Sequence, residues 1–566
     1  MEQLKPIQFN RFANGVVSSV NPNSQPVASI PHAINFLFDE ELDSAVTRTG
    51  LTGIGSQTQN NPILGLHNHN GTNSFALAVV SNGANNVIYK STGGSWSSSL
   101  ATDTKDLQTS FAQFLDTTIR VNGTNDPVST TDATTWATTG GNLNVGQLVS
   151  SGIKGDIVKV YKQRLQVIDN STVYISSVPL DFLDYDGQTA NFTVGNTLRG
   201  ATSGATAIIV NDSDSGTTGT LILANVKGIF INNETISETD ATGTPGSATA
   251  NGGSSRKISW QYGNKENIQV DPQNGSDIIG VGTVGGVEGI EIFFKTNGAY
   301  RYNGSFLDAK PFTTLGCTST NSVVEFSGGI GFANKYGYCF TNGNDAKIIT
   351  TPVRDWWDNI AAAFLDNISA FANDRYLLIC IGDITKKDVL GKSKTYNNVV
   401  LRKSLTSDAW SVLSFSKEFT QFVEYKTSTG DYQTWGGTTD GYIYQLFAGT
   451  SDSSTPIQYE LDFPQIIGDS IYSKKNISEY VGLYGKGTKG IKLYCSLDEN
   501  KFEDVGSCEE VINKVQLGEE IEGNVIRFKL ANYQIGAPVT IRDFTIPYID
   551  TDGHGGAIGI TDRYKK

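Results

Sequence analysis

Apolar and polar positions alternate with a period of two over short segments of the chain, and polar turns interrupt the alternation. Three segments share one form: a β-branched stretch, a polar turn, and a tryptophan at the start of the return stretch. They lie at residues 85–99, 126–139 and 398–413, with Trp96, Trp136 and Trp410. Alternation on both sides of a polar turn is typical of β-hairpins. The pattern therefore predicts a chain built mainly from antiparallel strands.

A second form of hairpin has Asn-Gly or Asp-Gly in its turn and tyrosines beside it, at residues 294–304, 338–350 and 438–447. Most of the hairpins recur at intervals of roughly 40–50 residues, which is typical of propeller blades. The interval from Tyr174 to Tyr300 is too long for this period. We therefore predict a mostly-β fold, a multi-bladed β-propeller that carries one insertion.

The insertion, residues 189–254, is rich in Gly, Thr, Ala and Ser and repeats itself. "FTVGNTLRGATSGATA" begins at Phe192, and "FINNETISETDATGTPGSATA" begins at Phe230. A disordered linker would not keep the apolar runs "AIIV" and "TLILANV" between the two copies. We expect a small inserted β-module that projects outward, because loops are where insertions are tolerated.

Helical periodicity is scarce. Residues 105–116 are one candidate. Residues 354–368 are a better one, with apolar side chains at i, i+3, i+4, i+7 and i+11 counted from Trp357. Two adjacent tryptophans on a lone helix favour packing in the core, with an interface to a neighbouring subunit as the alternative.

From about Ser454 the alternating strands become longer, which predicts a separate C-terminal antiparallel β-sandwich. The predicted organisation is propeller, first part, at 1–188; inserted module at 189–254; propeller, second part, at 255–453; and sandwich at 454–566. Within the first part, residues 30–55 predict a first propeller strand pair. Asn35 and the Arg48 to Gly50 segment would set its turns.

The chain carries 43 Lys and Arg against 57 Asp and Glu, so its net charge is 43 − 57 = −14. Affinity for DNA needs clustered Lys and Arg, so this balance argues against a surface that grips phosphates. It does not exclude a protein that DNA passes without binding. The sequence has no apolar run of about 18 residues that would span a membrane and no apolar signal-peptide core at its start. We expect synthesis in the cytoplasm.

The five cysteines are odd in number and form no C-x-x-C pair, so we expect reduced, buried thiols. They are Cys317, Cys339, Cys380, Cys495 and Cys508.

Two histidines, His67 and His69, are the closest pair in the sequence. At i and i+2 in a strand they would share a face and could bind a metal, but no third ligand lies near them in the sequence. We expect them instead to lie exposed on a polar, Asn-rich loop.

Several acidic turns are candidate sites. "TTDATTW" at 130–136 nearly matches the sialidase Asp-box, but its glycine is absent and its spacing is one residue short. Residues 184–188, 211–216 and 550–556 place carboxylates at i and i+2 beside Gly, which calcium favours, yet none completes a twelve-residue loop. Asx-turns are the simpler interpretation. With no nucleotide-binding, hydrolase or metalloprotease motif, we expect no enzyme and no catalytic, cofactor-binding or metal-binding residue.

The order of several segments resembles a known family. These segments are "FNRFANGVVSS", "FDEELDSAVTRTGLTGI", "RLQVIDNSTVYISSVPLDF", "GIEIFFKTNGAYRYNG", "AKIITTPVRDWWDNI" and the C-terminal "SKKNISEYVGLYGKGTKGIKLYCSLDENKFEDVG". In this order they are similar to the β-propeller tail proteins of short-tailed bacteriophages. That family includes the nozzle, or tail tubular protein B, and related tail hub proteins. The resemblance covers most of the chain outside residues 189–254.

The resemblance implies a structural virion protein located in the phage tail. Such proteins form a ring, typically of six copies, below the portal and adaptor, contact tail fibre or hub proteins, and enclose the channel through which viral DNA leaves. A rigid propeller, cyclic symmetry and a net negative charge agree with that role. A carbohydrate-binding or receptor-recognition tail protein is the first alternative, because exposed Trp and Tyr stack on sugars. A propeller hydrolase is the second.

Overall fold

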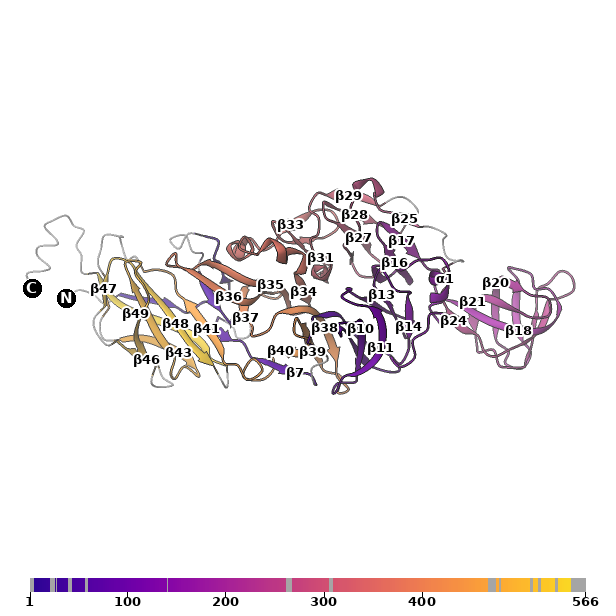
Figure 1. Cartoon of the computed structure of the whole chain (residues 1–566), viewed down its shortest axis with the longest axis horizontal. Helices are drawn as coiled ribbons and strands as arrows, with labels where there is room; N and C mark the ends of the chain where they lie inside the picture. The colour runs from indigo at the N-terminus through magenta and orange to yellow at the C-terminus, as the bar shows by residue number, and fades with distance from the viewer. Residues whose placement is uncertain are drawn as a thin grey trace, which may run out of the picture.

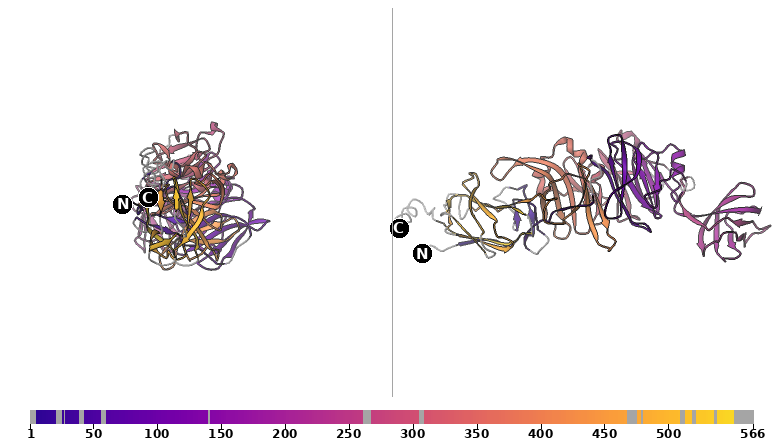
Figure 2. Two further views of the ribbon diagram at one scale, coloured as in Figure 1. Left: turned by 90° about the vertical axis from the view of Figure 1, so that its left-hand side faces the viewer. Right: turned by 60° about the horizontal axis from the view of Figure 1, so that its bottom comes forward.

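The computed structural model describes residues 5–20, 26, 28–38, 43–55, 60–139, 141–260, 267–304, 309–466, 475–477, 480–508, 513–517, 521–534 and 538–550. The fold is mostly β, with many small sheets that are antiparallel apart from the short pairings of β2. Three parts follow one another along the long axis (Figure 1). A terminal body contains β1 and β49, a seven-sheet body follows, and an inserted module lies at the far end; Figure 2 shows the same order from a second direction.

The seven-sheet body consists of small meanders that follow one another along the chain. The first four are β8 (Ile63–His69), β9 (Phe75–Ser81), β10 (Asn85–Ser91) and β11 (Ser97–Thr104); β12 (Ser110–Phe114), β13 (Thr117–Val121) and β14 (Val128–Thr130); β15 (Ile157–Tyr161), β16 (Arg164–Asp169), β17 (Thr172–Ile175) and β25 (Ile268–Gln269); and β26 (Gly280–Val284), β27 (Ile290–Lys295), β28 (Gly298–Tyr302) and β29 (Lys310–Thr313).

The other three meanders complete the body. They are β30 (Val324–Phe326), β31 (Gly329–Asn334), β32 (Gly337–Thr341) and β33 (Ala346–Ile348); β34 (Ser369–Ala372), β35 (Tyr376–Lys387), β36 (Ser393–Ser404) and β37 (Trp410–Ser414), with the short β2 (Gly15–Val16) and β3 (Ser29–Ile30) beside β37; and β38 (Phe419–Lys426), β39 (Tyr432–Thr438), β40 (Ile443–Leu446) and β7 (Leu51–Gly53).

The seven meanders are arranged in a closed cycle. The first strand of each sheet lies beside the first strand of the next, in the order β8, β12, β15, β26, β30, β34, β38 and back to β8. In the seventh sheet the outer strand is β7, which comes from the N-terminal part of the chain and pairs Leu51 with Leu446. Two distant segments of sequence therefore close one sheet.

Apolar side chains fill the spaces between neighbouring sheets of the cycle. Ile63, Ala78, Trp435 and Ile443 share one cluster between the first and seventh sheets. Phe294 and Phe332 lie 4.6 Å apart in a cluster between the fourth and fifth. β9, "FALAVVS", is buried along its whole length because both of its faces are covered. This continuous burial explains why β9 reads as an apolar run and not as an alternation.

The terminal body contains two antiparallel sheets that share one apolar core. One holds β1 (Lys5–Phe9), β5 (Phe36–Leu37), β6 (Ala45–Thr47), β42 (Lys475–Ile477), β43 (Tyr480–Lys486), β46 (Asn513–Gln516), β47 (Ile521–Gly523) and β49 (Thr540–Asp550); the other holds β4 (His32–Ile34), β41 (Ile457–Asp462), β44 (Lys492–Leu497), β45 (Glu503–Ser507) and β48 (Ile526–Gln534). Phe544 of one sheet stacks on Phe463, next to β41, at 4.2 Å, and contacts Phe528 of the other sheet. Residues from both sheets thus lie in the same core.

The N-terminal strands differ from the prediction for residues 30–55. β4, β5 and β6 lie in the terminal body with C-terminal strands, whereas β7, like β3 at the start of this stretch, joins the seven-sheet body. Phe36 packs edge-on against Tyr459 at 5.6 Å, which draws this apolar stretch into the terminal core. The alternation predicts strands correctly here, but it does not reveal which strands they pair with.

The inserted module is a β-structure that closes on itself. Its strands are β18 (Leu180–Ala190), β19 (Thr197–Gly200), β20 (Thr206–Asp214), β21 (Gly219–Lys227), β22 (Thr235–Glu238), β23 (Ser247–Ala250) and β24 (Ser255–Lys257). The order β21-β20-β19-β22-β23-β18 is closed by a second pairing of β18 with β21, which makes a barrel. Its core contains only residues of the module itself, between Leu183 and Ala250. The module begins at β18, several residues before the predicted boundary at 189.

Helical structure is short wherever it occurs in the described chain. It comprises α1 (Val145–Ser150), α2 (Arg354–Trp357) and the 3-10 turns at Pro272–Asn274, Thr320–Ser322, Thr351–Val353 and Ala362–Asn367. The helix predicted at 105–116 is wrong: this segment forms β12, and Leu115 and Asp116 make its turn with positive φ. The helix predicted at 354–368 is interrupted, because Ala361 is extended.

The adjacent tryptophans in α2 are core residues, as one of the two interpretations predicts. Trp356 and Trp357 are 0% and 2% exposed, and both belong to the core cluster that includes the terminal body. Trp410 begins β37 and is also buried. The five cysteines are buried and none forms a disulfide.

Candidate functional site

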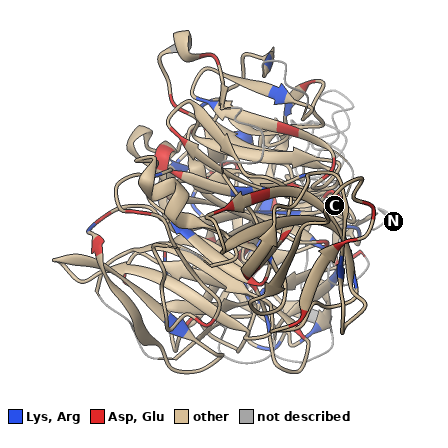
Figure 3. Ribbon diagram, turned by 90° about the vertical axis from the view of Figure 1, so that its right-hand side faces the viewer, with Lys and Arg blue, Asp and Glu red and all other residues tan. Residues whose placement is uncertain are grey.

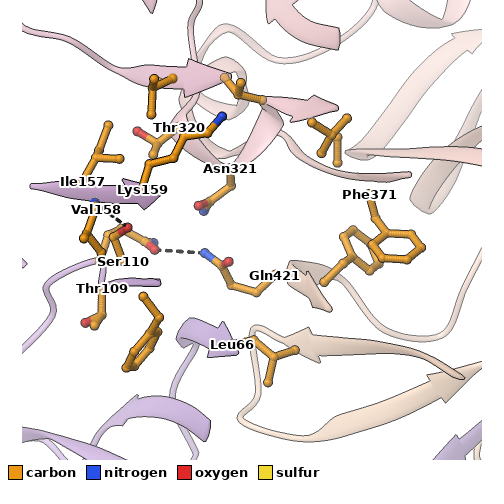
Figure 4. Close-up of a pocket in the computed structure, with 18 of the residues that line it drawn as sticks. Leu66, Thr109, Ser110, Ile157, Val158, Lys159, Thr320, Asn321, Phe371 and Gln421 are labelled. Carbon is orange, nitrogen blue, oxygen red and sulfur yellow. Dashed lines mark hydrogen bonds between the residues drawn. The ribbon is translucent and has the colours of Figure 1, made fainter. Parts of the chain in front are cut away.

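A cavity of about 410 Å³ lies where the first strands of all seven sheets meet (Figure 4). Every sheet of the cycle contributes to its wall, so the cavity marks the centre of the seven-sheet body. Side chains from the seven sheets in turn are Leu66, Ser110, Lys159, Val281, Glu325, Phe371 and Gln421.

The polar side of the cavity is already organised by contacts within the protein. Lys159 forms an ion pair with Glu325, which also accepts hydrogen bonds from the Thr283 backbone N–H at 2.7 Å and from its hydroxyl at 2.8 Å. Burial alone would raise the pKa of Glu325, but Lys159 and Thr283 together hold it below its usual value. Across the cavity, Gln421 donates to Gln108 at 3.1 Å, as Figure 4 shows.

The apolar side of the cavity contains phenyl rings. Phe371 and Phe422 lie 6.3 Å apart, and Phe111 stacks on His67 at 5.4 Å. Burial, and secondarily His69, lowers the pKa of His67 to about 3, so this imidazole is neutral at pH 7. The ring therefore supports Phe111 as a flat, uncharged surface.

Both histidines of the pair lie in a strand, β8, and not on an exposed loop as the sequence led us to expect. His69 is fully buried and stacks on Phe75 at 4.4 Å. Its Nδ1 is 2.8 Å from Thr118 Oγ1, and its Nε2 is 3.3 Å from Asp116 Oδ1. Burial lowers the pKa of His69, while Asp116 opposes the shift.

The acidic turns noted in the sequence accept hydrogen bonds from backbone N–H groups. Asp132 accepts from the N–H groups of Thr134 and Thr135 at 2.7 and 2.9 Å, and these bonds lower its pKa. The Trp136 indole N–H donates to the Ser99 hydroxyl at 2.8 Å. Hydrogen bonds therefore fix this hairpin both at Asp132 and at Trp136.

The three calcium-like turns also make local contacts where the structure describes them. Asp214 accepts from the N–H of Gly216 at 2.6 Å, which is an Asx-turn, and Asp184 accepts from the Thr220 hydroxyl at 2.6 Å. The turn at 550–556 lies almost wholly outside the described residues. Within those residues, no group of three His, Cys, Asp or Glu side chains is placed to hold a metal ion.

Sequence reasoning assigned Arg48 to a turn but did not find its partners. Its guanidinium is completely buried and binds Asp452 through two bonds of 2.7 and 2.6 Å. It also donates to Asn35 Oδ1 and the Ser414 carbonyl, both at 2.7 Å, and lies 3.9 Å from the Phe415 ring. Arg48 therefore ties the N-terminal segment to the end of the sixth sheet, at Ser414 and Phe415, and to the segment that enters the terminal body, at Asp452. The available signal in the sequence was an arginine within an apolar stretch. Its partner, Asp452, is 404 residues away.

A second buried network, which the sequence analysis missed, joins the terminal body to the sixth sheet. Glu460 of β41 pairs with Lys394 of β36 and lies 3.7 Å from His32 of β4. Burial would raise the pKa of Glu460, but His32 and Lys394 lower it to about 2. Asp462, on the same strand, has its pKa raised to about 6 by burial. These charged groups hold two parts of the molecule together.

A larger open recess, about 1210 Å³, lies beside the sixth and seventh sheets and the terminal body. Its wall includes Arg375, Tyr376 and Tyr432, and Tyr432 is 63% exposed. Like the central cavity, this recess is lined by amide, hydroxyl and aromatic groups. Both can bind uncharged polar molecules through amide, hydroxyl and aromatic groups.

Comparison with known proteins adds little to this description. No family model matches the sequence, and no curated protein matches it either. Among solved structures, "YCF48 bound to D1 peptide" aligns with a TM-score of 0.35 at 9% identity over 71% of this chain and 95% of that one. "YCF48 from Cyanidioschyzon merolae" gives 0.32 at 12% over 70% and 98%, and "Phage phi92 endosialidase" gives 0.21 at 11% over 78% and 69%. At these TM-scores the likeness carries neither a fold nor a function to this chain.

In the part of the chain that the structure describes, no helix has both the length and the apolar character to cross a membrane.

Proposed function

We propose that the seven-sheet body is a seven-bladed β-propeller and that the terminal body is a β-sandwich. The closed cycle of first strands and the completion of the seventh sheet by β7 support the propeller. Two sheets that share a core, with Phe544 between Phe463 and Phe528, support the sandwich.

We further propose that the protein is a structural component of a short-tailed phage virion, a subunit of the ring-shaped tail nozzle. The observation that carries the proposal is where the family-like segments lie in the fold. "AVTRTGLTGI" contains Arg48 at the joint with the terminal body, and "RDWWDNI" places Trp356 in the core shared with that body. "RLQVIDNSTVYISSVPLDF" runs through β16 and β17 into β18, from the propeller into the barrel. The resemblance thus follows segments that connect the three parts of the chain.

In this proposal the DNA channel runs between copies of the chain and not through one propeller. The central cavity measures about 410 Å³, a volume typical of a small-molecule pocket. The major groove of a DNA duplex is by itself about 12 Å wide. A conduit therefore requires several subunits around a common axis, which cyclic symmetry supplies.

The charge distribution supports passage without tight binding. The net charge is −14. Acidic and basic residues alternate along the ribbon when the molecule is viewed from the end that carries the inserted barrel (Figure 3). A surface of this kind lacks the clustered cations that hold phosphates. Adaptor, portal and hub or fibre proteins would be the protein partners of such a ring.

Negative-stain imaging with mass determination, on the purified chain and on disrupted virions, tests the proposal. We expect a hollow ring of about six copies with a channel between them. A compact trimer at the tail periphery would contradict the conduit role.

A receptor- or carbohydrate-binding tail protein is the second candidate, favoured by the recess with the exposed Tyr432 beside Arg375. Stacking of a sugar ring on tyrosine would supply the binding energy. Glycan-array binding that Tyr432→Ala abolishes would support it, while equal, background-level binding of both proteins would count against it.

A further inference from the structure

Two buried oxygen atoms at the joint between the third and fourth sheets have no hydrogen-bond donor. They are Glu291 Oε1 and Gln166 Oε1, and the two residues are 0% and 1% exposed. Gln166 of β16 donates from Nε2 to the other carboxyl oxygen of Glu291, on β27, at 3.0 Å. Leaving two acceptors unpaired in the protein interior is costly, so the pair requires another donor.

A proton on the carboxyl group supplies that donor. A carboxylic acid and a primary amide are complementary, since each offers one donor and one acceptor on the same side. With the proton on Oε1, Glu291 donates to Gln166 Oε1 while Gln166 Nε2 continues to donate to Glu291 Oε2. Both unpaired oxygens are then satisfied by one proton. We propose that Glu291 is a neutral carboxylic acid that forms this reciprocal pair with the Gln166 amide and joins the third sheet to the fourth.

The two ammonium groups that favour ionisation of Glu291, those of Lys159 and Lys162, have other partners. Lys159 is paired with Glu325, and Lys162 donates to the Asn303 carbonyl at 2.7 Å, so both nearby ammonium groups are bound elsewhere. Glu325 adds a second negative charge from the fifth sheet.

The tyrosine side chains on neighbouring strands carry no positive charge that would offset a negative charge on Glu291. Tyr161 donates its hydroxyl to the Gly289 carbonyl at 2.8 Å, and Tyr302 lies opposite Glu291 in β28 and contacts Tyr161. Glu288, exposed on the same hairpin, contributes further negative potential at Tyr161. Burial raises the pKa of Glu291 from 4.5 to about 7, with Lys159 and the Gln166 bond opposing the shift.

The proton makes this joint sensitive to pH. Because the folded-state pKa lies above the unfolded value, the folded chain holds more protons than the unfolded chain between about pH 4.5 and 7. The stabilisation is complete below about pH 4.5 and is lost as the pH rises through about 7. The joint between the third and fourth sheets therefore weakens progressively from about pH 4.5 to about pH 7.

The test is a ¹³C NMR titration of the full chain labelled at the glutamate side-chain carboxyl carbon. Glu291→Gln assigns the Glu291 signal by its disappearance. The proposal expects that signal in the protonated position at pH 6, with a midpoint near pH 7. A Glu291 signal already ionised at pH 6, as a water-bridged carboxylate would give, overturns it.

The same substitution gives a second, independent readout. A glutamine at 291 can donate where the acid O–H donates, so the amide pair keeps both hydrogen bonds without a titrating proton. We expect Glu291→Gln to melt at the wild-type temperature near pH 4, where Glu291 is protonated in both states, and above it at pH 8.5. Glu288→Gln, on the exposed part of the same hairpin, is the matched control and should follow wild type at both values. A Glu291→Gln protein that fails to fold, or that melts lower near pH 4, overturns the proposal, because the neutral pair would then not exist.

Discussion

Arg48 shows how much of the coupling between parts of this molecule depends on single buried side chains. Its guanidinium contacts three distant segments, through Asn35, Ser414 and Asp452. The sequence drew attention to Arg48 but indicated only a turn, because an ion pair between residues 404 positions apart has no local signature. The same limit hid the Glu291–Gln166 pair and the Glu460–Lys394 pair, whose partners come from different sheets.

Removing the Arg48 charge should be strongly destabilising. Arg48→Met leaves the buried Asp452 carboxylate without its cation, which typically costs about 3–5 kcal/mol. We expect a loss of that size in urea unfolding followed by tryptophan fluorescence. Arg375→Met, at an exposed arginine, should change stability by no more than about 0.5 kcal/mol. Equal effects of the two substitutions would contradict the role given to Arg48.

Glu234 gives a residue-scale prediction with a pH dependence. This buried carboxylate accepts from the backbone N–H groups of Ser203 and Ile231 at 2.9 and 2.8 Å, and so ties together the two internal repeats of the barrel. Burial alone would raise its pKa, but these bonds lower it. Glu234→Gln should destabilise the barrel by about 1–3 kcal/mol at pH 7.

The sign of this pH effect follows from the lowered pKa. The stabilisation by Glu234 is present above its unfolded-state pKa near 4.5 and is lost as the pH falls through the lower folded-state value. The difference between wild type and Glu234→Gln should therefore shrink in acid, measured by hydrogen exchange of the barrel. Asp186→Asn, at an exposed position of β18, is the control, and a difference that grows in acid would refute the assignment.

At the scale of elements, the existence of most strands could be predicted from the sequence and their pairing could not. The hairpins at 85–99 and 398–413 form β10–β11 and β36–β37, because alternation and turn residues are local signals. The helix predicted at residues 105–116 is wrong because the apolar positions there fit both the helical period and the strand period. The partners of β4 to β7 depend on chain closure, which leaves no trace in a linear pattern.

Closure of the seventh sheet by β7 gives the element-scale prediction. Gly50 precedes β7, and a Cβ there would lie 2.0 Å from the Ser451 carbonyl oxygen. Gly50→Ala must therefore move backbone and should destabilise by about 1–3 kcal/mol. Gly94→Ala, where a Cβ meets no atom within 4 Å, is the matched control. Thermal unfolding of both variants checks the prediction, and a Gly50→Ala protein as stable as Gly94→Ala would contradict it.

At the scale of the whole molecule, the three parts have different degrees of independence. The terminal body and the seven-sheet body share a core and exchange strands, whereas the barrel has its own core. The sequence predicted the barrel as a separate module from its internal repeat, since a repeat is a local signal. Its chain enters and leaves side by side, with Ser177 donating to the Ser259 carbonyl at 2.7 Å.

Deletion of the barrel should leave the rest of the molecule intact. Leu180 and Lys257 face each other across β18 and β24, so an Asn-Gly turn can replace residues 181–256. We expect the melting temperature of the remaining protein to change by no more than about 4 °C. Collapse of the remaining fold would show that the barrel is part of the core. A folded deletion variant that does not enter virions would place the barrel in assembly.

The central claim is that this chain is one subunit of a conduit whose channel lies between copies. An electron cryo-microscopy reconstruction of the assembled particle tests it most directly, because the propeller axes can be located relative to the symmetry axis. The account predicts a cyclic ring of about six copies, with each central cavity off the axis and the channel lined by several subunits. DNA density through the centre of one propeller, or a compact trimer without a channel, would contradict it.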